Sequence, residues 1–171
     1  MQINRYGKPY ATIGTPPEVG EPLPNFTLKS ANEKTRITTK DLLGKPLLIS
    51  VVPNINTRVC TTQTIQFNRA SDLVTAARFV TISTNTCAEQ LDWCGIKGVT
   101  SMEMLSDADA SFGEAMALYM PTNATLARAV FIVAPSGKII YREFMTEQTN
   151  EPDYLAALNF IRKFCALNHL R

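Results

Sequence analysis

The sequence lacks several features that would place it in a familiar functional class. Its formal net charge is only +2, from 17 basic and 15 acidic residues, and the basic residues form no block. No apolar run approaches the roughly 20 residues that a membrane-spanning helix needs. The first residues show no basic segment followed by an apolar one, so we expect no signal peptide. These absences argue against nucleic acid and membrane as partners and favour a cytoplasmic protein.

The sequence also lacks the pattern of histidine and cysteine residues that binds zinc. His169 is the only histidine, and the histidine and cysteines do not show the spacing of a zinc site. The four cysteines, Cys60, Cys87, Cys94 and Cys165, include no CxxC pair, which argues against a redox motif of that kind. Thiols are normally reduced in a cytosol, so any disulfide would be transient and either catalytic or sensing.

The pattern of apolar runs predicts a mixed α/β protein. The 171 residues are enough for one domain with a substantial core, so we predict a single domain over 1–171. An N-terminal hairpin is expected within residues 1–14. The other predicted elements are strands at 25–30, 34–38, 45–52, 78–83 and near 104–105, helices at about 60–77, 87–94, 108–118 and 153–167, and a hairpin at 127–144. This order predicts an α/β fold with a central mixed sheet flanked by helices, for which a thioredoxin-like arrangement is one natural solution.

Short local signals predict where some helices begin and end. Thr39 is a candidate N-cap for a short helical turn, and TCAE at residues 86–89 has the spacing of a capping box. Gly95 and Gly98 are expected to end the helix that follows this box. Pro152 stands where the first position of the last helix is expected.

The stretch PNINTRVC, residues 53–60, places a cysteine where a buried strand passes into a helix. Pro53 lacks an N–H and restricts the preceding residue to extended geometry, so it marks the end of the strand. Thr57 is a candidate N-cap, which puts Cys60 at the third helical position. Unpaired N–H groups and the helix dipole favour a thiolate there, and the Thr57 hydroxyl could contact the sulfur or a bound oxygen. The sequence thus predicts a rigid, electropositive and partly exposed cysteine; a buried cysteine that merely begins a helix is the alternative.

This stretch resembles the peroxidatic loop of the peroxiredoxins, PxxxTxxC, at all three fixed positions, Pro53, Thr57 and Cys60. The chain is further similar to the thiol peroxidase subfamily of atypical two-cysteine peroxiredoxins. The segments that carry this similarity include VVPNINTRVCTTQTIQFN, WCGIKG, ARAVFIV and TNEPDYLAAL. The resemblance covers essentially the whole chain and implies a thioredoxin-like fold of the peroxiredoxin type.

The resemblance implies a role for each of five residues. Cys60 would be the peroxidatic cysteine, whose thiolate attacks a hydroperoxide and becomes a sulfenic acid. Cys94 would be the resolving cysteine, which forms an intrachain disulfide with Cys60. Pro53 would shield the sulfur, and Thr57 would hydrogen-bond to the sulfur and the peroxide. Arg128 would support the thiolate and polarise the O–O bond.

The resemblance also implies the partners of the reaction. Thioredoxin, recharged by its NADPH-dependent reductase, would reduce the disulfide. The subfamily forms homodimers, tends to favour organic hydroperoxides over hydrogen peroxide, and uses no metal, haem or flavin. We therefore expect a hydroperoxide substrate, a thioredoxin partner, a homodimer and no cofactor.

Two places depart from the subfamily pattern. Arg58 stands where the subfamily usually has glycine, and we interpret it as a solvated charge whose effect on Cys60 is open in direction. The stretch YMPTNATL, residues 119–126, replaces the usual glycine-containing loop before the arginine. This stretch is expected to shape the substrate pocket and therefore bears on which peroxide is preferred.

Cys87, Cys165 and Arg128 can also be interpreted as structural residues. Cys87 and Cys94 would lie about 10 Å apart along an intact helix, too far for a disulfide. Cys87 is therefore expected to be a packed residue, with a backup resolving thiol as the alternative. Cys165 lies on the apolar face of the last helix and is expected in the core. Arg128 is either an edge residue or a buried arginine that needs an anion, for which a thiolate is suitable.

Three functions use these residues differently. A thiol-dependent peroxidase would turn over with Cys60 and Cys94, whereas a redox sensor or relay would use the same disulfide switch to alter a partner. A thioredoxin-fold binding module would hold inert cysteines. The complete set of Pro53, Thr57, Cys60 and Arg128 argues against the last of these and favours the peroxidase.

Overall fold

The computed structural model describes residues 1–32, 35–99 and 102–171. In chain order the strands of its main sheet are β3 (Thr27–Ser30), β4 (Arg36–Thr38), β5 (Leu47–Val51), β6 (Arg78–Ser83), β7 (Glu103–Ser106), β10 (Ala129–Val133) and β11 (Ile139–Phe144). Across the described residues these seven strands are ordered β11-β10-β5-β6-β7-β3-β4. The pairs β5–β6 and β6–β7 are parallel and the other neighbours are antiparallel, so the sheet is mixed as predicted.

Five helices and two small hairpins complete the described part of the chain. The helices are α1 (Thr39–Leu42), α2 (Arg58–Ser71), α3 (Cys87–Lys97), α4 (Ser111–Ala115) and α5 (Tyr154–Leu167). The hairpins are β1 (Gln2–Arg5) with β2 (Lys8–Ala11), as expected at the N-terminus, and β8 (Tyr119–Met120) with β9 (Thr125–Leu126). No helix in these described segments is long and apolar enough to cross a membrane.

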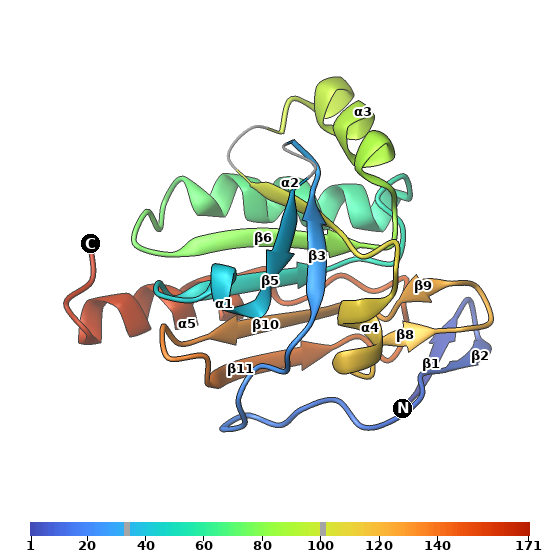
Figure 1. Cartoon of the computed structure of the whole chain (residues 1–171), viewed down its shortest axis with the longest axis horizontal. Helices are drawn as coiled ribbons and strands as arrows, with labels where there is room; N and C mark the ends of the chain where they lie inside the picture. The colour runs from blue at the N-terminus through green and yellow to red at the C-terminus, as the bar shows by residue number, and fades with distance from the viewer. Residues whose placement is uncertain (33–34, 100–101) are drawn as a thin grey trace.

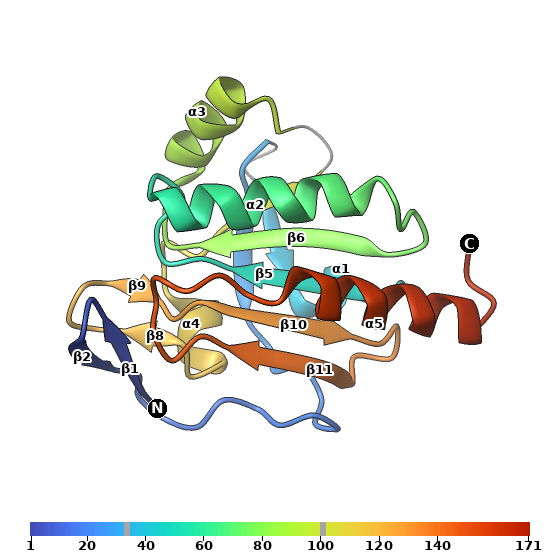
Figure 2. The same cartoon turned by 180° about the vertical axis from the view of Figure 1, so that it is seen from behind.

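The helices cover the sheet from two sides, with α1 and α4 on the face seen in Figure 1 and α2 and α5 on the face seen in Figure 2. Strand β5 shows why its sequence reads as a continuous apolar run. Leu47, Ile49 and Val51 belong to the core cluster that includes α4 residues, whereas Leu48 belongs to the cluster that includes α2 and α5 residues. Successive side chains of a strand point to opposite faces, so a strand buried on both faces is apolar throughout.

The N-terminal hairpin is attached to the segment before α5. The backbone N–H of Asn4 donates to the carbonyl of Thr146 at 2.7 Å, and the N–H of Gln148 donates to the carbonyl of Asn4 at 2.7 Å. These two hydrogen bonds bring the first residues of the chain beside a loop near its end, and both views show the hairpin next to β8 and β9 (Figures 1 and 2). One end of the molecule is thus built from segments that are far apart in sequence.

The predicted N-cap of α1 is wrong by one residue. Thr38 precedes the helix, and its backbone N–H and its hydroxyl both donate to the Asp41 carboxylate at 2.8 Å. The hydroxyl of Thr39 instead donates to the carbonyl of Pro24 at 2.8 Å and accepts from the N–H of Phe26 at 3.0 Å. Either threonine has the residue type of an N-cap. The choice between them depends on a contact with a distant loop.

Other helix ends also differ from the prediction. Gly95 lies inside α3, and only Gly98, at φ 67°, ends that helix. Pro152 precedes the true N-cap of α5, Asp153, whose carboxylate accepts from the N–H of Ala156 at 2.9 Å. Gly98 ends α3 because its left-handed backbone costs glycine little.

The helix predicted at 108–118 is shorter at both ends. Ala110, at φ 59°, precedes α4, and Ala117, at φ 55°, follows it, and this left-handed backbone interrupts a helix. The helix predicted at 60–77 begins two residues earlier and ends at Ser71. Lys34, the first residue of the strand predicted at 34–38, lies outside the described residues.

Candidate active site around Cys60

The structure confirms the N-cap that the sequence predicts for helix α2. Thr57 is its N-cap residue, with φ −84° and ψ 153°, and Cys60 is its third residue. The carbonyl of Asn54 accepts hydrogen bonds from the Thr57 N–H at 3.1 Å and from the Thr57 hydroxyl at 3.0 Å. Strand β5 ends at Val51, and the chain turns through residues 52–57 before it enters the helix.

Cys60 is fully buried, with 0% of its surface exposed, so the predicted partial exposure is wrong. It belongs to the apolar cluster that contains Val52, Ile55 and Trp93. A pocket of about 800 Å³ lies beside it, and Pro53, Thr57 and Arg128 are among its lining residues. The predicted position of Cys60, the third residue of the helix, is confirmed. Exposure depends on what packs over that position, which local spacing does not indicate.

Arg128 brings its guanidinium to the sulfur. It stands just before β10, is 3% exposed, and donates from Nη2 to Sγ of Cys60 at 3.3 Å. Its Nη1 donates to Oε1 of Gln63 at 2.9 Å, and its Nε donates to the carbonyl of Gln148 at 2.9 Å. The buried-arginine interpretation is therefore correct, because all three guanidinium nitrogens are engaged inside the protein.

Two glutamines that the sequence analysis missed hold Arg128 in place. Gln63 also donates from Nε2 to the Ser50 hydroxyl at 2.9 Å, which links α2 to β5. Gln148 accepts from the backbone N–H of Arg128 at 2.6 Å through its side chain. Gln63 follows Cys60 by three positions and so shares its helix face, which was a usable signal. Gln148 lies in an irregular segment, and no local pattern points to it.

Among the hydrogen bonds of the described residues, none joins Thr57 to the Cys60 sulfur, so the expected contact between them is absent. Its one hydroxyl hydrogen is directed to the carbonyl of Asn54, while its side chain lines the pocket. A hydroxyl also has two lone pairs that accept hydrogen bonds. The geometry leaves Thr57 Oγ1 as an acceptor at the pocket wall.

Cys94 lies on α3, half-buried, and packs against the same apolar cluster as Cys60. Burial raises the pKa of the Cys94 thiol above its ordinary value. Its neighbour Trp93 donates from Nε1 to the hydroxyl of Thr61 at 3.2 Å. Because Thr61 follows Cys60 directly, this bond joins α3 to the first turn of α2. All four cysteines are free thiols in this structure.

The other cysteines lie elsewhere in the fold. Cys87 is the first residue of α3, is half-buried, and its thiol contacts the carbonyl of Ser30 at 3.7 Å. Cys165 is buried in the cluster beneath α5, which confirms its predicted core position. Within the residues that the structure describes, no group of three or more His, Cys, Asp or Glu side chains is arranged to hold a metal ion.

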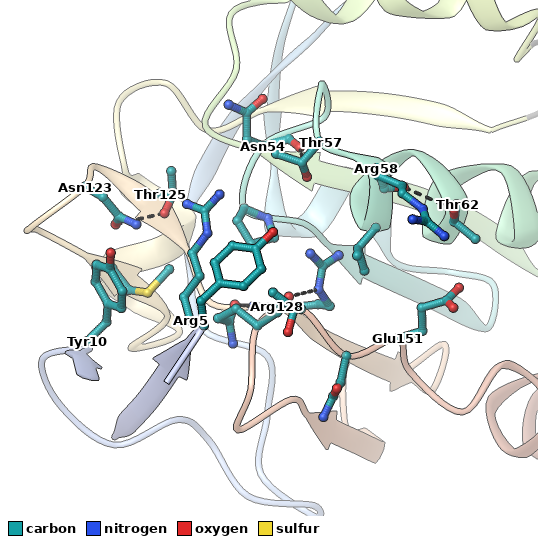
Figure 3. A pocket seen from close by; sticks show the side chains of 17 residues that line it. Arg5, Tyr10, Asn54, Thr57, Arg58, Thr62, Asn123, Thr125, Arg128 and Glu151 are labelled. Carbon is teal, nitrogen blue, oxygen red and sulfur yellow. Dashed lines mark hydrogen bonds between the residues drawn. The ribbon is translucent and has the colours of Figure 1, made fainter. Parts of the chain in front are cut away.

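Figure 3 shows this pocket, and its lining residues come from five parts of the chain. Arg5 and Tyr10 come from the N-terminal hairpin, and Asn123 and Thr125 come from the β8–β9 hairpin. The remaining labelled residues come from the entrance and first turns of α2, from the start of β10 and from the loop before α5; they are Asn54, Thr57, Arg58, Thr62, Arg128 and Glu151. Both departures from the subfamily pattern, the arginine at 58 and the stretch 119–126, therefore border this pocket.

The chain is similar to known proteins over most of its length. Residues 18–158 match the Redoxin family. The chain is 38% identical over 154 residues to a protein of Bacillus subtilis named thiol peroxidase, covering 90% of this chain and 92% of that protein. It is 39% identical over 159 residues to a thiol peroxidase of Staphylococcus aureus, covering 92% of this chain and 95% of the relative.

Solved structures resemble the fold at low sequence identity. A peroxiredoxin-like protein from Aquifex aeolicus has a TM-score of 0.88 at 24% identity and covers 95% of this chain and 96% of its own. A thiol peroxidase from Chromobacterium violaceum has a TM-score of 0.86 at 15% identity, with 96% and 97% of the two chains covered. These likenesses confirm the predicted thioredoxin-like fold of the peroxiredoxin type. With the family match and the sequence relatives, they lead to one identification: the chain belongs to the Redoxin family and, within it, to the thiol peroxidases.

Proposed function

We propose that this thiol-dependent peroxidase reduces hydroperoxides at Cys60, with Arg128, Thr57 and Pro53 completing the site. One observation carries the proposal, which is the 3.3 Å hydrogen bond from Arg128 Nη2 to Cys60 Sγ beside the pocket. The other two guanidinium nitrogens bind uncharged amide and carbonyl oxygens. The buried positive charge therefore has a counter-charge at hand when Cys60 is a thiolate, and a buried charge without one is costly.

The reaction follows from the electron count at the two reacting atoms. The Cys60 thiolate attacks the terminal oxygen of the hydroperoxide, so an S–O bond forms as the O–O bond breaks. Sulfur is oxidised by two electrons, and the peroxide is reduced to an alcohol, or to water for hydrogen peroxide, after the leaving oxygen takes a proton. Arg128 stabilises negative charge that moves from sulfur to the leaving oxygen.

Thr57 and Pro53 orient and shield the peroxide. Because the Thr57 hydroxyl donates to Asn54, its Oγ1 can accept a hydrogen bond from the single O–H of a hydroperoxide. Such a bond would align the O–O axis with the sulfur. Pro53 lines the same pocket and offers no N–H, so it covers the sulfur without competing for the peroxide oxygens.

Cys94 is proposed as the resolving thiol. It would attack the Cys60 sulfenic acid, releasing water and forming an intrachain disulfide that thioredoxin then reduces. Cys60 and Cys94 lie on two separate folded helices, and both thiols are free. Joining them calls for local unwinding of helix structure, for which Gly95 within α3 and Gly98 at its end are suitable because glycine adopts many backbone conformations.

The domain organisation, substrate, reductant and oligomeric state are also part of the proposal. We propose that residues 1–171 act as one domain, supported by the hydrogen bonds between Asn4 and the segment at 146–148. The substrate would be an organic hydroperoxide or hydrogen peroxide and the reductant thioredoxin, with no bound cofactor. A homodimer in the cytoplasm would be the working form.

Peptide mapping after oxidation tests this proposal. The wild-type protein is treated with one equivalent of cumene hydroperoxide, free thiols are blocked, and peptides are identified by mass spectrometry. A Cys60–Cys94 linkage is expected, Cys60→Ser should abolish peroxide consumption, and Cys94→Ser should stop after one turnover with a sulfenic acid on Cys60. Cys87→Ser is the matched control and should turn over with thioredoxin. Four unmodified cysteines in the wild type would refute the proposed chemistry at Cys60, and steady turnover by Cys94→Ser would assign resolution to another thiol.

A further inference from the structure

The pocket beside Cys60 carries more positive than negative charge. Three arginines line it, Arg5, Arg58 and Arg128, whereas Glu151 is the only acidic residue in its lining. Oε1 of Glu151 already accepts a hydrogen bond from the hydroxyl of Tyr154 at 2.7 Å. The pocket wall therefore carries three cationic side chains and one carboxylate, which leaves an excess of positive charge.

Two of these arginines are free to bind a ligand. Arg128 uses all three guanidinium nitrogens inside the protein. Among the residues that the structure describes, the guanidinium groups of Arg5 and Arg58 have no carboxylate or hydrogen-bond partner. The guanidinium of Arg5 lies over the ring of Tyr6, 5.9 Å from its centroid, which leaves its N–H donors unused.

The fold holds Arg5 and Arg58 at opposite walls of the pocket. Figure 3 shows Arg128 between them, with Arg5 reaching up from the hairpin and Arg58 extending from the start of α2. The hairpin is fixed by the hydrogen bonds of Asn4 to the loop that also carries Gln148, the partner of Arg128. The two free guanidinium groups therefore have a defined position relative to Cys60.

Another carboxylate near the hairpin does not change this balance. Glu147 accepts from the backbone N–H groups of Tyr6 and Gly7 at 3.2 and 3.4 Å, and from the hydroxyl of Thr149 at 3.0 Å. It is not part of the pocket lining. Its carboxylate fastens the turn of the hairpin and leaves the Arg5 guanidinium without an ion pair.

We propose that Arg5 and Arg58 select hydroperoxides that carry an anionic group, such as a carboxylate, on the part of the molecule remote from the peroxide. This inference rests on the proposed function and names the substrate class of the same site. The peroxide group would reach Cys60 while the anion stays at the rim, between the two guanidinium groups. Arginine suits this role because its planar, always charged group binds carboxylates through paired hydrogen bonds. A pocket of about 800 Å³ has room for a substrate of this kind.

The test compares two cumene hydroperoxides that differ only in the para substituent, a carboxylate in one and the uncharged carboxamide in the other. The second-order rate constant for Cys60 oxidation is measured for each by rapid acid quench and mass spectrometry of the intact protein. At low ionic strength we expect the carboxylate to react about tenfold faster. That preference should shrink toward one in about 0.5 M salt, because salt screens exposed charges.

Each variant is judged by the ratio of its rate constants for the carboxylate and the carboxamide peroxide. This ratio remains informative if a substitution slows both reactions. In the double variant Arg5→Gln, Arg58→Gln the ratio should fall to about one. Arg69→Gln removes the same charge from an exposed site about three turns further along α2 and should keep the wild-type ratio.

The outcomes separate this inference from the proposed function. Equal rate constants for the two peroxides in the wild type, or a preference that survives in the double variant, would overturn the role of Arg5 and Arg58 and leave the peroxidase intact. Failure of both peroxides to oxidise Cys60 would overturn the proposed function itself.

Discussion

Arg128 donates a hydrogen bond from Nη2 to Sγ of Cys60 at 3.3 Å, although the two residues are 68 positions apart. Strand pairing brings them together, because β10 lies beside β5 with Ala129 opposite Val51. Arg128 immediately precedes β10, and β5 leads through the PNINTRVC turn into α2. The sheet therefore fixes the separation of guanidinium and sulfur before any substrate enters, which is the preorganisation that electrostatic catalysis requires.

Arg128→Lys should lower the second-order rate constant for Cys60 oxidation by about a hundredfold. Lysine keeps the charge, but its single nitrogen cannot serve Cys60, Gln63 and the Gln148 carbonyl together. The rate is measured by stopped-flow reaction with cumene hydroperoxide. Arg69→Lys makes the same substitution on the exposed face of α2 and serves as the control. An unchanged rate constant in Arg128→Lys would show that charge alone is sufficient.

Thr57→Val should slow peroxide attack by about tenfold, the effect of losing one hydrogen bond that is made in the transition state. Valine keeps the shape of threonine but removes the acceptor that faces the pocket. Thr57→Ser restores a hydroxyl at the same place and should recover most of the rate. Equal rates for the valine and serine variants would remove the proposed acceptor role.

Disulfide formation should accelerate as the pH rises from about 6 to about 9, because the thiolate of Cys94 is the attacking form. Burial raises the pKa of this thiol, so only a small fraction is ionised at neutral pH. The protein is oxidised with one equivalent of peroxide, quenched at successive times, and the Cys60–Cys94 linkage is quantified by mass spectrometry. A rate of linkage that does not change with pH would instead indicate that unwinding of the helix limits the step.

Ionisation of the buried Asp107 carboxyl should lower the free energy of unfolding as the pH rises from about 4 to about 6. Burial raises the pKa of its carboxyl from 3.8 to about 6, and the charges of Asp109 and Glu114 act in the same direction. The folded state therefore binds the proton more tightly than the unfolded state. The resulting stabilisation is complete below the unfolded pKa and is lost as the pH passes the folded one.

Urea unfolding of the wild type and Asp107→Asn between about pH 4 and pH 7 measures this effect. The wild type should lose about 2.5 kcal/mol of unfolding free energy relative to the variant over this range, since each pKa unit corresponds to about 1.4 kcal/mol and part of the effect is already lost at pH 4. The asparagine retains one acceptor for the N–H groups of Phe112 and Gly113, which now bind the carboxylate. Parallel pH profiles for the two proteins would contradict the raised pKa.

Elements defined by neighbouring residues could be predicted from the sequence. The strand at 78–83 was predicted with its observed bounds, and Thr57 and Cys60 occupy the predicted N-cap and third positions of α2. The hairpin at 127–144 follows from two apolar runs around a proline–serine–glycine turn. Such features depend on alternation, capping and turn formation within a few residues, and these are properties of the local chain.

What lies over and around Cys60 depended on segments that meet only in the folded protein. The sequence placed Cys60 at a helix entrance but did not indicate that packing would bury it completely. It singled out Arg128 as a residue in need of an anion but missed Gln148, which comes from an irregular segment, and Arg5, which reaches the pocket from the other end of the chain. The sequence by itself therefore determined the reactive turn and the strands and helices around it, because short-range geometry defines them. Tertiary structure decided the burial of the sulfur, the support of the guanidinium and the charge of the pocket, because each requires side chains from distant segments to converge.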